Sequence, residues 1–163
     1  MFKKFVAAAA LFAASAAAFA AEPPSWYAGI DVSSTKIEGV DREAGYGAFL
    51  GYKFNESIAI EGGYHRLADT EFGTTNVTID QVDLSLLGSL PLSNGFDVYG
   101  RLGYNRLEAD ADVAGFSVKE HESKVLYGVG LGYTFSPIVH GRLEVQKPTS
   151  DATKLVAGVS FKF

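Results

Sequence analysis

The feature that most constrains the fold of this chain is an alternation of apolar and polar residues with a period of two, which continues to the last residue, Phe163. Successive side chains of a β-strand point to opposite faces of a sheet, so the alternation predicts strands with one apolar face. Glycine is frequent within the alternating runs, and glycine disfavours helices. The sequence therefore predicts an all-β fold.

Eight alternating runs can be marked along the chain, with boundaries that carry an error of a few residues. We expect strands at 26–33, 45–54, 58–66, 77–90, 96–107, 123–135, 139–146 and 153–163. Short turns at 55–57, 93–95 and 136–138 alternate with longer polar loops at about 34–44, 67–76, 108–122 and 147–152. This alternation of short and long connections is typical of an antiparallel up-and-down transmembrane β-barrel.

The first residues have the composition of a secretory signal peptide. Lys3 and Lys4 precede an apolar, alanine-rich run at 5–19, and Ala18 and Ala20 supply the small residues of a cleavage site. We therefore expect a signal peptide at 1–20 and the β-barrel domain at 21–163. A membrane-anchoring helix is the alternative, but this run is shorter than the roughly 20 residues that a spanning helix needs.

Composition excludes several classes of function. The chain contains no cysteine, which rules out disulfides, a thiol nucleophile and a cysteine-ligated metal. Loss of Lys3 and Lys4 with the signal peptide changes the formal net charge from −5 to −7. Because nucleic-acid-binding domains are basic, we expect no nucleic acid partner.

The distribution of charge between the two strand faces distinguishes a membrane barrel from a soluble barrel of the lipocalin kind. One face carries no charge through the middle of any strand. The other combines glycines with the charged residues Asp31, Lys53, Glu61, Asp83, Arg101, Lys124, Arg142, Glu144 and Lys162. Glycine would weaken strands on a soluble outer surface, whereas a narrow lumen needs small residues between large ones. We therefore place the charged face inside and the apolar face toward lipid.

Aromatic residues on the apolar face cluster at both ends of the strands, as in the girdles of membrane barrels. The girdle residues that we predict are Trp26, Tyr46, Tyr52, Tyr64, Tyr104, Tyr127, Tyr133 and Phe135. Ordinary aromatic enrichment in strands is the alternative, but it predicts no such banding. Phe49 does not fit, because it falls on the inward face.

Five charged residues of the inward face form the candidate site: Glu61, Asp83, Arg101, Arg142 and Glu144. If the register is simple, their strands bring most of them to similar heights, where they form a salt-bridged plug that closes the lumen to water. The alternative is that these charges only neutralise one another within a packed interior.

Catalysis has little support in this sequence. His65 and His140 fall at opposite ends of the barrel, which is too far apart for a shared triad, and His121 lies in an acidic stretch. Three scattered histidines are also a weak case for a metal site. We expect neither enzymatic activity nor a metal or cofactor.

Several short stretches resemble the OmpA-type family of eight-stranded outer-membrane barrels: 26–29, 97–103, 142–146 and 158–163. The resemblance implies a cell outer membrane location in a Gram-negative envelope. It also implies contact with outer-membrane lipid and lipopolysaccharide, and a monomeric barrel whose lumen charges block or gate a small pore. Phe161 and Phe163 resemble the terminal signal that the outer-membrane assembly machinery reads, and periplasmic chaperones would escort the chain. Larger members carry a peptidoglycan-binding domain, so without one we expect no tethering to the cell wall.

The sequence leaves two functions open. One is a structural barrel that supports envelope integrity and contains a narrow or gated pore. The other is an adhesion or host-interaction barrel that acts through its extracellular loops. A barrel enzyme acting on lipid is a third, weaker alternative. The expected loops, of about 6 to 15 residues, favour the first function because they offer little surface for recognition.

Overall fold

The structure of the protein is a computed structural model that describes residues 23–37, 43–72, 75–113, 116–149 and 152–163. The predicted signal peptide at 1–20 lies outside these residues. Within the described ranges, no helix is long and apolar enough to cross a bilayer.

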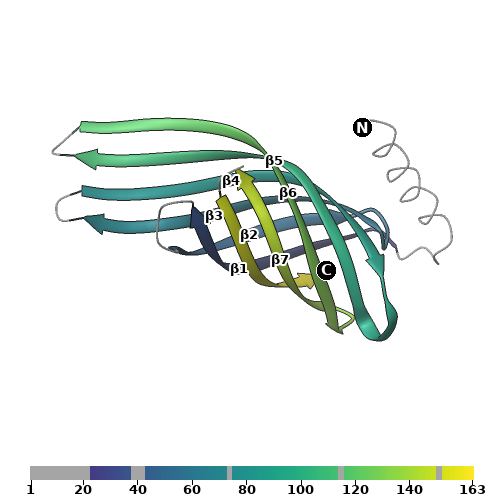
Figure 1. Ribbon diagram of the computed structural model, residues 1–163. Helices are drawn as coiled ribbons and strands as arrows, with labels where there is room; N and C mark the ends of the chain where they lie inside the picture. The colour runs from purple at the N-terminus through teal and green to yellow at the C-terminus, as the bar shows by residue number, and fades with distance from the viewer. Residues whose placement is uncertain (1–22, 38–42, 73–74, 114–115, 150–151) are drawn as a thin grey trace, which may run out of the picture.

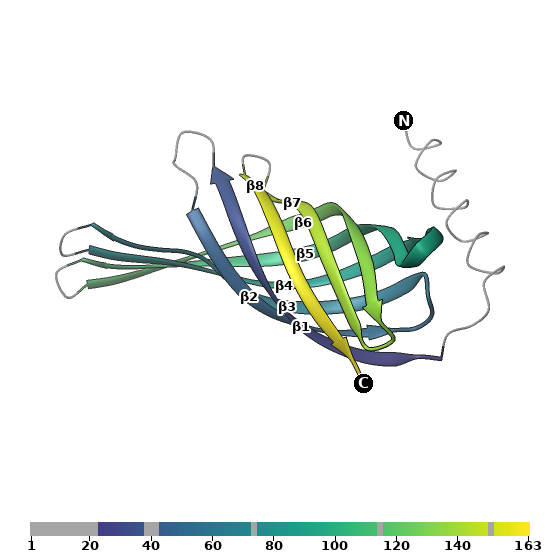
Figure 2. The same cartoon turned by 90° about the horizontal axis from the view of Figure 1, so that it is seen from below.

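Eight antiparallel strands form one closed barrel in which each strand pairs with its sequence neighbours (Figures 1 and 2). They are β1 (Ser25–Ile37), β2 (Glu43–Lys53), β3 (Ile58–Phe72), β4 (Thr75–Pro91), β5 (Phe96–Val113), β6 (Phe116–Ser136), β7 (Val139–Thr149) and β8 (Ala152–Lys162). The predicted fold class is therefore confirmed.

Closure of the barrel explains why an alternating strand reaches the last residue. β1 and β8 pair from Tyr27 opposite Lys162 to Ile37 opposite Ala152. Beyond this ladder, the backbone N–H of Phe163 donates to the carbonyl oxygen of Trp26 at 3.0 Å. A closed barrel leaves no strand edge unpaired in the hydrocarbon, where water is absent.

The alternation of the sequence becomes an alternation of burial. On β7, for example, Arg142 and Glu144 are buried while Leu143 and Val145 face outward and are exposed. The same pattern on the other strands lines the lumen with polar and charged residues and covers the outside with aliphatic and aromatic ones. The barrel is thus polar inside and apolar outside, as a lipid environment requires.

The expected loops at 67–76 and 108–122 are wrong, because the strands continue through most of both segments. β3 and β4 pair as far as Phe72 opposite Thr75, and β5 and β6 pair as far as Val113 opposite Phe116. The resulting hairpins project well beyond the barrel wall (Figures 1 and 2). Apolar alternation reports one-sided burial, whereas backbone pairing needs no apolar face, so the alternation underestimates how far these strands continue.

The two hairpins also pair with each other, because β4 and β5 remain in register as far as Asn76 opposite Asp112. By contrast, the β2 ladder on β3 stops at Arg66, and the β7 ladder on β6 begins at Tyr127. An open four-stranded sheet therefore extends from one rim of the barrel. We call the part of β3–β6 beyond those two ladders the projecting sheet.

The opposite rim is made of tight turns with defined backbone chemistry. Asn55 starts one of them, because its side-chain oxygen accepts hydrogen bonds from the backbone N–H groups of Ser57 and Ile58 at 2.8 and 2.9 Å. The β4–β5 turn contains a short 3-10 segment, η1 (Ser93–Gly95), in which Asn94 and Gly95 have φ values of 62° and 80°. Positive φ is easy for glycine and strained for most other residues.

Gly95→Ala is expected to lower the free energy of unfolding by about 1–2 kcal/mol, the usual strain of a side chain in the left-handed region. Urea unfolding of the barrel refolded into lipid vesicles measures the change. Gly100→Ala is the matched control, since a methyl group there meets nothing within 4 Å. Equal stability of Gly95→Ala and the control would contradict a strained backbone at position 95.

Candidate functional site

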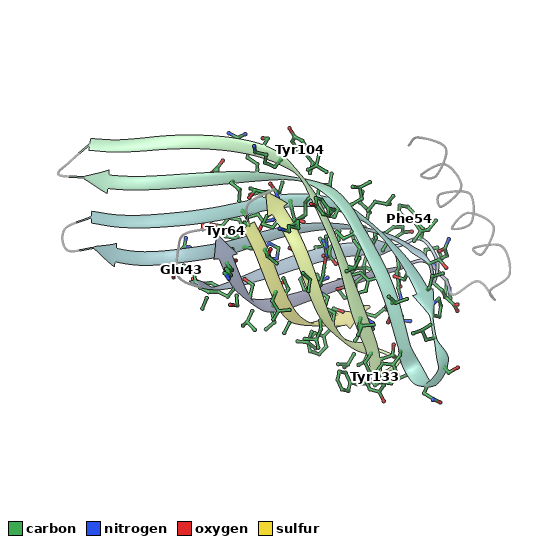
Figure 3. All side chains as sticks on the ribbon, viewed as in Figure 1. Glu43, Phe54, Tyr64, Tyr104 and Tyr133 are labelled. Atoms are coloured by element: carbon green, nitrogen blue, oxygen red, sulfur yellow. The ribbon has the colours of Figure 1, made fainter. Side chains whose placement is uncertain are left out.

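The candidate site is a layer of charged side chains across the middle of the lumen. Glu61 enters it from β3, Arg101 from β5, and Arg142 and Glu144 from β7. We call these four residues the central layer. Figure 3 shows the inward and outward side chains together on the ribbon.

Both arginines of the central layer bind the Glu61 carboxylate. Arg101 Nη2 donates to Glu61 Oε1 at 2.6 Å, and Arg142 Nη1 donates to Glu61 Oε2 at 2.7 Å. Arg101 Nε also donates to Glu144 Oε1 at 2.7 Å. Asp83, the fifth predicted residue, approaches Arg101 Nη1 at 3.6 Å. The structure thus brings all five predicted site residues together.

The central layer is excluded from solvent, so its charges depend on one another. No side chain in its ion pairs is more than 5% exposed. A buried ion is stable only when partners satisfy it, and removal of one partner from a buried pair typically costs about 3–5 kcal/mol. The layer is therefore a tightly coupled unit rather than a set of separate pairs.

Inward-facing aromatic residues, which the sequence did not assign to the site, complete the central layer. The hydroxyl groups of Tyr27 and Tyr99 donate to Glu61 and Glu144 at 3.0 and 2.9 Å. The guanidinium of Arg142 lies over the ring of Phe49, 3.6 Å from its centroid, in a cation–π contact. The inward position of Phe49, which looked like an exception, is thus part of the site. Tyr27 and Tyr99 could have been found from the sequence in the same way, because each is an aromatic residue on the inward face of its strand.

Glycines on the neighbouring strands provide the space for these large side chains. Tyr27 lies opposite Gly51, Tyr99 opposite Gly130, and Arg101 opposite Gly128. A methyl group added at Gly51 or Gly130 would overlap the tyrosine ring beside it. The interleaving of small and large residues expected for a narrow lumen is present at these positions.

A second polar layer lies toward the projecting sheet. His65 stands between two aspartates, with Nε2 at 3.1 Å from Asp31 and Nδ1 at 3.3 Å from Asp83. Lys154 is fully buried and donates to the side-chain oxygen of Gln81 at 3.2 Å. We call these five residues the upper layer. Several of its polar atoms have no protein partner, including Asp31 Oδ1 and Gln81 Nε2.

Toward the short turns, the lumen opens into a cavity of about 300 Å³. Its apolar wall includes Ala59, Leu87 and the rings of Tyr27 and Tyr99. Glu61 and Arg142 line its inner end, and the other end carries the polar pair His140–Asp97, which is 2.8 Å apart. The central layer thus separates this cavity from the upper layer.

The predicted girdle residues lie on the outside of the barrel at two levels. Tyr64 and Tyr104 lie near the projecting sheet, whereas Phe54 and Tyr133 lie near the short turns (Figure 3). At the short-turn level, the ring of Tyr52 packs tilted against Trp26 and edge-to-face against Phe54. The ring of Tyr133 packs tilted against Phe96 and edge-to-face against Phe135. The other predicted girdle residues, Tyr46 and Tyr127, are exposed as well.

The predicted assembly signal, Phe161 and Phe163, lies at the short-turn rim. Both rings are exposed, at 51% and 73%. Their recognition by the assembly machinery stays a prediction.

Among the side chains that the structure describes, no group of three or more His, Cys, Asp or Glu residues is placed to hold a metal ion. His65 and His140 each pair with aspartate, in the upper layer and at the cavity mouth respectively. The side chain of His121 lies outside the described residues.

The sequence has identifiable relatives among outer-membrane proteins. It is 27% identical to Outer membrane protein A of Salmonella typhi over 180 residues, which cover 92% of this chain and 51% of the relative. Identity to Outer membrane protein A of Serratia marcescens is 30% over 142 residues, or 74% and 40% of the two chains. The chain therefore spans about half the length of the curated relatives it matches.

Solved structures share the fold at lower identity. Ail of Yersinia pestis superposes with a TM-score of 0.64 at 19% identity and covers 86% of this chain and 97% of its own. The N-terminal β-barrel domain of Pseudomonas aeruginosa OprF gives a TM-score of 0.62 at 16% identity and covers 84% and 97%.

The family described as "Outer membrane protein beta-barrel domain" matches residues 6–163, nearly the whole chain. With the closed eight-stranded barrel and its polar lumen, this match shows that the chain belongs to that family and is an outer-membrane β-barrel protein.

Proposed function

We propose that this protein is a structural component of the outer membrane whose narrow lumen is closed by the central layer. Opening as a pore would require the layer to rearrange. The single observation that carries this proposal is the convergence of Arg101 and Arg142 on Glu61, buried across the lumen between the cavity and the upper layer.

The contacts of Arg142 support a gate rather than a permanent wall. This residue holds Glu61 at 2.7 Å and approaches Asp31 in the upper layer at 3.4 Å. Its guanidinium therefore has carboxylates at two heights within reach. Exchange between such alternatives keeps the charge paired, which is the condition for movement in a low-dielectric interior.

We further propose that the barrel is a monomer and that outer-membrane lipid and lipopolysaccharide surround it. The two levels of aromatic side chains match the interfaces of a bilayer. Assembly would use the outer-membrane assembly machinery and periplasmic chaperones, with Phe161 and Phe163 as the recognised end.

Arg142→Ala is the direct test of the closed pore. Loss of this side chain removes a cation from Glu61 and a contact from Phe49, and a bias of only about 1.4 kcal/mol toward open states raises their population tenfold. We expect at least about a tenfold rise in integrated conductance in planar bilayers. Arg106→Ala is the matched control, because Arg106 pairs with Glu108 on the outer surface and is half exposed. Unchanged conductance of Arg142→Ala would remove the gating role.

The projecting sheet favours adhesion as a second candidate function. It presents β3 beyond Arg66 and β6 before Tyr127 without the β2 and β7 ladders that cover these strands in the barrel. Such edges can add a strand from another protein. Ail, which shares the fold, is the attachment invasion locus protein of Yersinia pestis. The larger surface of the hairpins removes the objection that short loops offer too little area.

Replacement of residues 111–118 by Asn-Gly tests adhesion. Asp110 and Lys119 are register partners, so a two-residue turn between them preserves the ladder below. If the projecting sheet mediates adhesion, bacteria with the shortened protein should adhere to host cells no better than bacteria lacking it. Heat-modifiable gel migration of the variant verifies that the barrel is intact. Full adherence of the shortened, folded protein would exclude adhesion through this hairpin.

A further inference from the structure

His65 occupies a position in the lumen that the proposed gate does not use. The residue is 3% exposed, and each ring nitrogen faces a different buried aspartate, Asp31 on β1 and Asp83 on β4. A neutral imidazole has only one N–H, so it can donate to one of these carboxylates but not to both. Nε2 is within hydrogen-bond distance of Asp31, whereas Nδ1 and the facing Asp83 Oδ2 have no hydrogen-bond partner. Only the protonated ring presents an N–H to both carboxylates.

The barrel wall is shaped around this imidazole ring. A methyl group at Gly47 would overlap the ring carbons of His65, and one at Gly63 would come within 2.5 Å of the ring and 2.6 Å of Asp83. The two glycines thus leave the space that the ring occupies between the aspartates.

The charge balance of the described lumen also depends on His65. Four carboxylates are buried there, Asp31, Glu61, Asp83 and Glu144, with three cations, Arg101, Arg142 and Lys154. The difference, three minus four, leaves one negative charge that a protonated His65 neutralises. An uncompensated buried charge is costly, so the protonation state of His65 changes the charge balance of the lumen.

We propose that His65 is a proton-dependent switch that controls how firmly Arg101 and Arg142 bind the carboxylates of Glu61 and Glu144. When the ring loses its proton, Asp31 and Asp83 need other cations. The nearest guanidinium groups are those of Arg142, at 3.4 Å from Asp31, and Arg101, at 3.6 Å from Asp83. Because the same two groups bind Glu61 and Glu144, any shift toward the aspartates loosens the central layer.

The charged groups on the strands around His65 are consistent with a shift of the arginines toward Asp31 and Asp83 when the ring loses its proton. β1 contributes Asp31, β4 contributes Asp83, and β2 contributes the uncharged Gly47. Arg101 on β5 and Arg142 on β7 lie beyond the aspartates, and Lys154 on β8 interacts electrostatically with both His65 and Asp31. On β3 itself, Glu61 is two positions below Gly63 and is already held by both arginines. Lys154, bound to Gln81, is a further cation near Asp31 and Asp83.

The titration itself is tested independently of any pore. In nanodiscs, ¹⁵N NMR between about pH 5 and about pH 9, the range in which an ordinary histidine changes charge, reports both ring nitrogens. We expect His65 to carry two protons at the acidic end, and its deprotonation to shift the Nε resonances of Arg101 and Arg142. A ring that stays neutral throughout, or that titrates without any change at the arginines, would overturn the switch.

The effect on conductance, which rests on the proposed pore, uses His65→Gln. Glutamine bridges polar groups but carries no charge at any pH. We expect the open probability of the wild type to rise about tenfold from acidic to alkaline pH, the ratio that one pK unit of proton coupling gives. His65→Gln should lose this dependence, whereas His140→Gln, the control at the cavity mouth, should keep it. Retention of the full dependence in folded His65→Gln would overturn the proposal.

The two measurements separate the two proposals. Coupled titration of His65 and the arginines without conductance at any pH would support the switch and contradict the pore. If His65→Gln fails to migrate as a heat-modifiable folded barrel, the wild-type NMR titration alone decides whether the switch stands.

Discussion

The structure depends on one constraint, the requirement that every backbone polar group in the bilayer be paired within the protein. Closure of β1 on β8 meets this requirement and, with eight strands, encloses a lumen just wide enough for side chains to fill. Side chains must fill that lumen. Because the outer face has to be apolar, the polar side chains are directed inward, where they have only one another as partners. The ion pairs around Glu61 follow from this confinement.

Small residues opposite large ones make it possible to enclose these polar side chains in the lumen. Glycines opposite Tyr27, Tyr99 and Arg101 allow large side chains to cross the lumen and meet residues of distant strands. Both layers retain buried polar atoms without a hydrogen-bond partner, one in the central layer, Arg142 Nε, and several in the upper layer. Buried polar atoms without protein partners are sites for ordered water.

The sequence was sufficient to predict the barrel, its orientation and the five charged residues of the candidate site, because lipid contact imposes a strict period of two. It was insufficient for the projecting sheet, where the strands β3 to β6 continue past the end of the apolar alternation. Register is the second gap. The contacts of Phe49 with Arg142 and of His65 with Asp31 join strands that are not neighbours, so no local pattern encodes them.

The central claim, that the apolar face meets lipid and the ionic face is sequestered, is tested most directly by a nitroxide scan along β6 from Val125 to Leu131. Collision rates with oxygen, which concentrates in hydrocarbon, are measured for each label in a refolded bilayer sample. We expect high rates at 125, 127, 129 and 131, whose side chains are exposed on the outer face, and low rates at the even positions between them. High oxygen collision rates at 126, 128 and 130, with water contact at the odd positions, would contradict this orientation of the barrel.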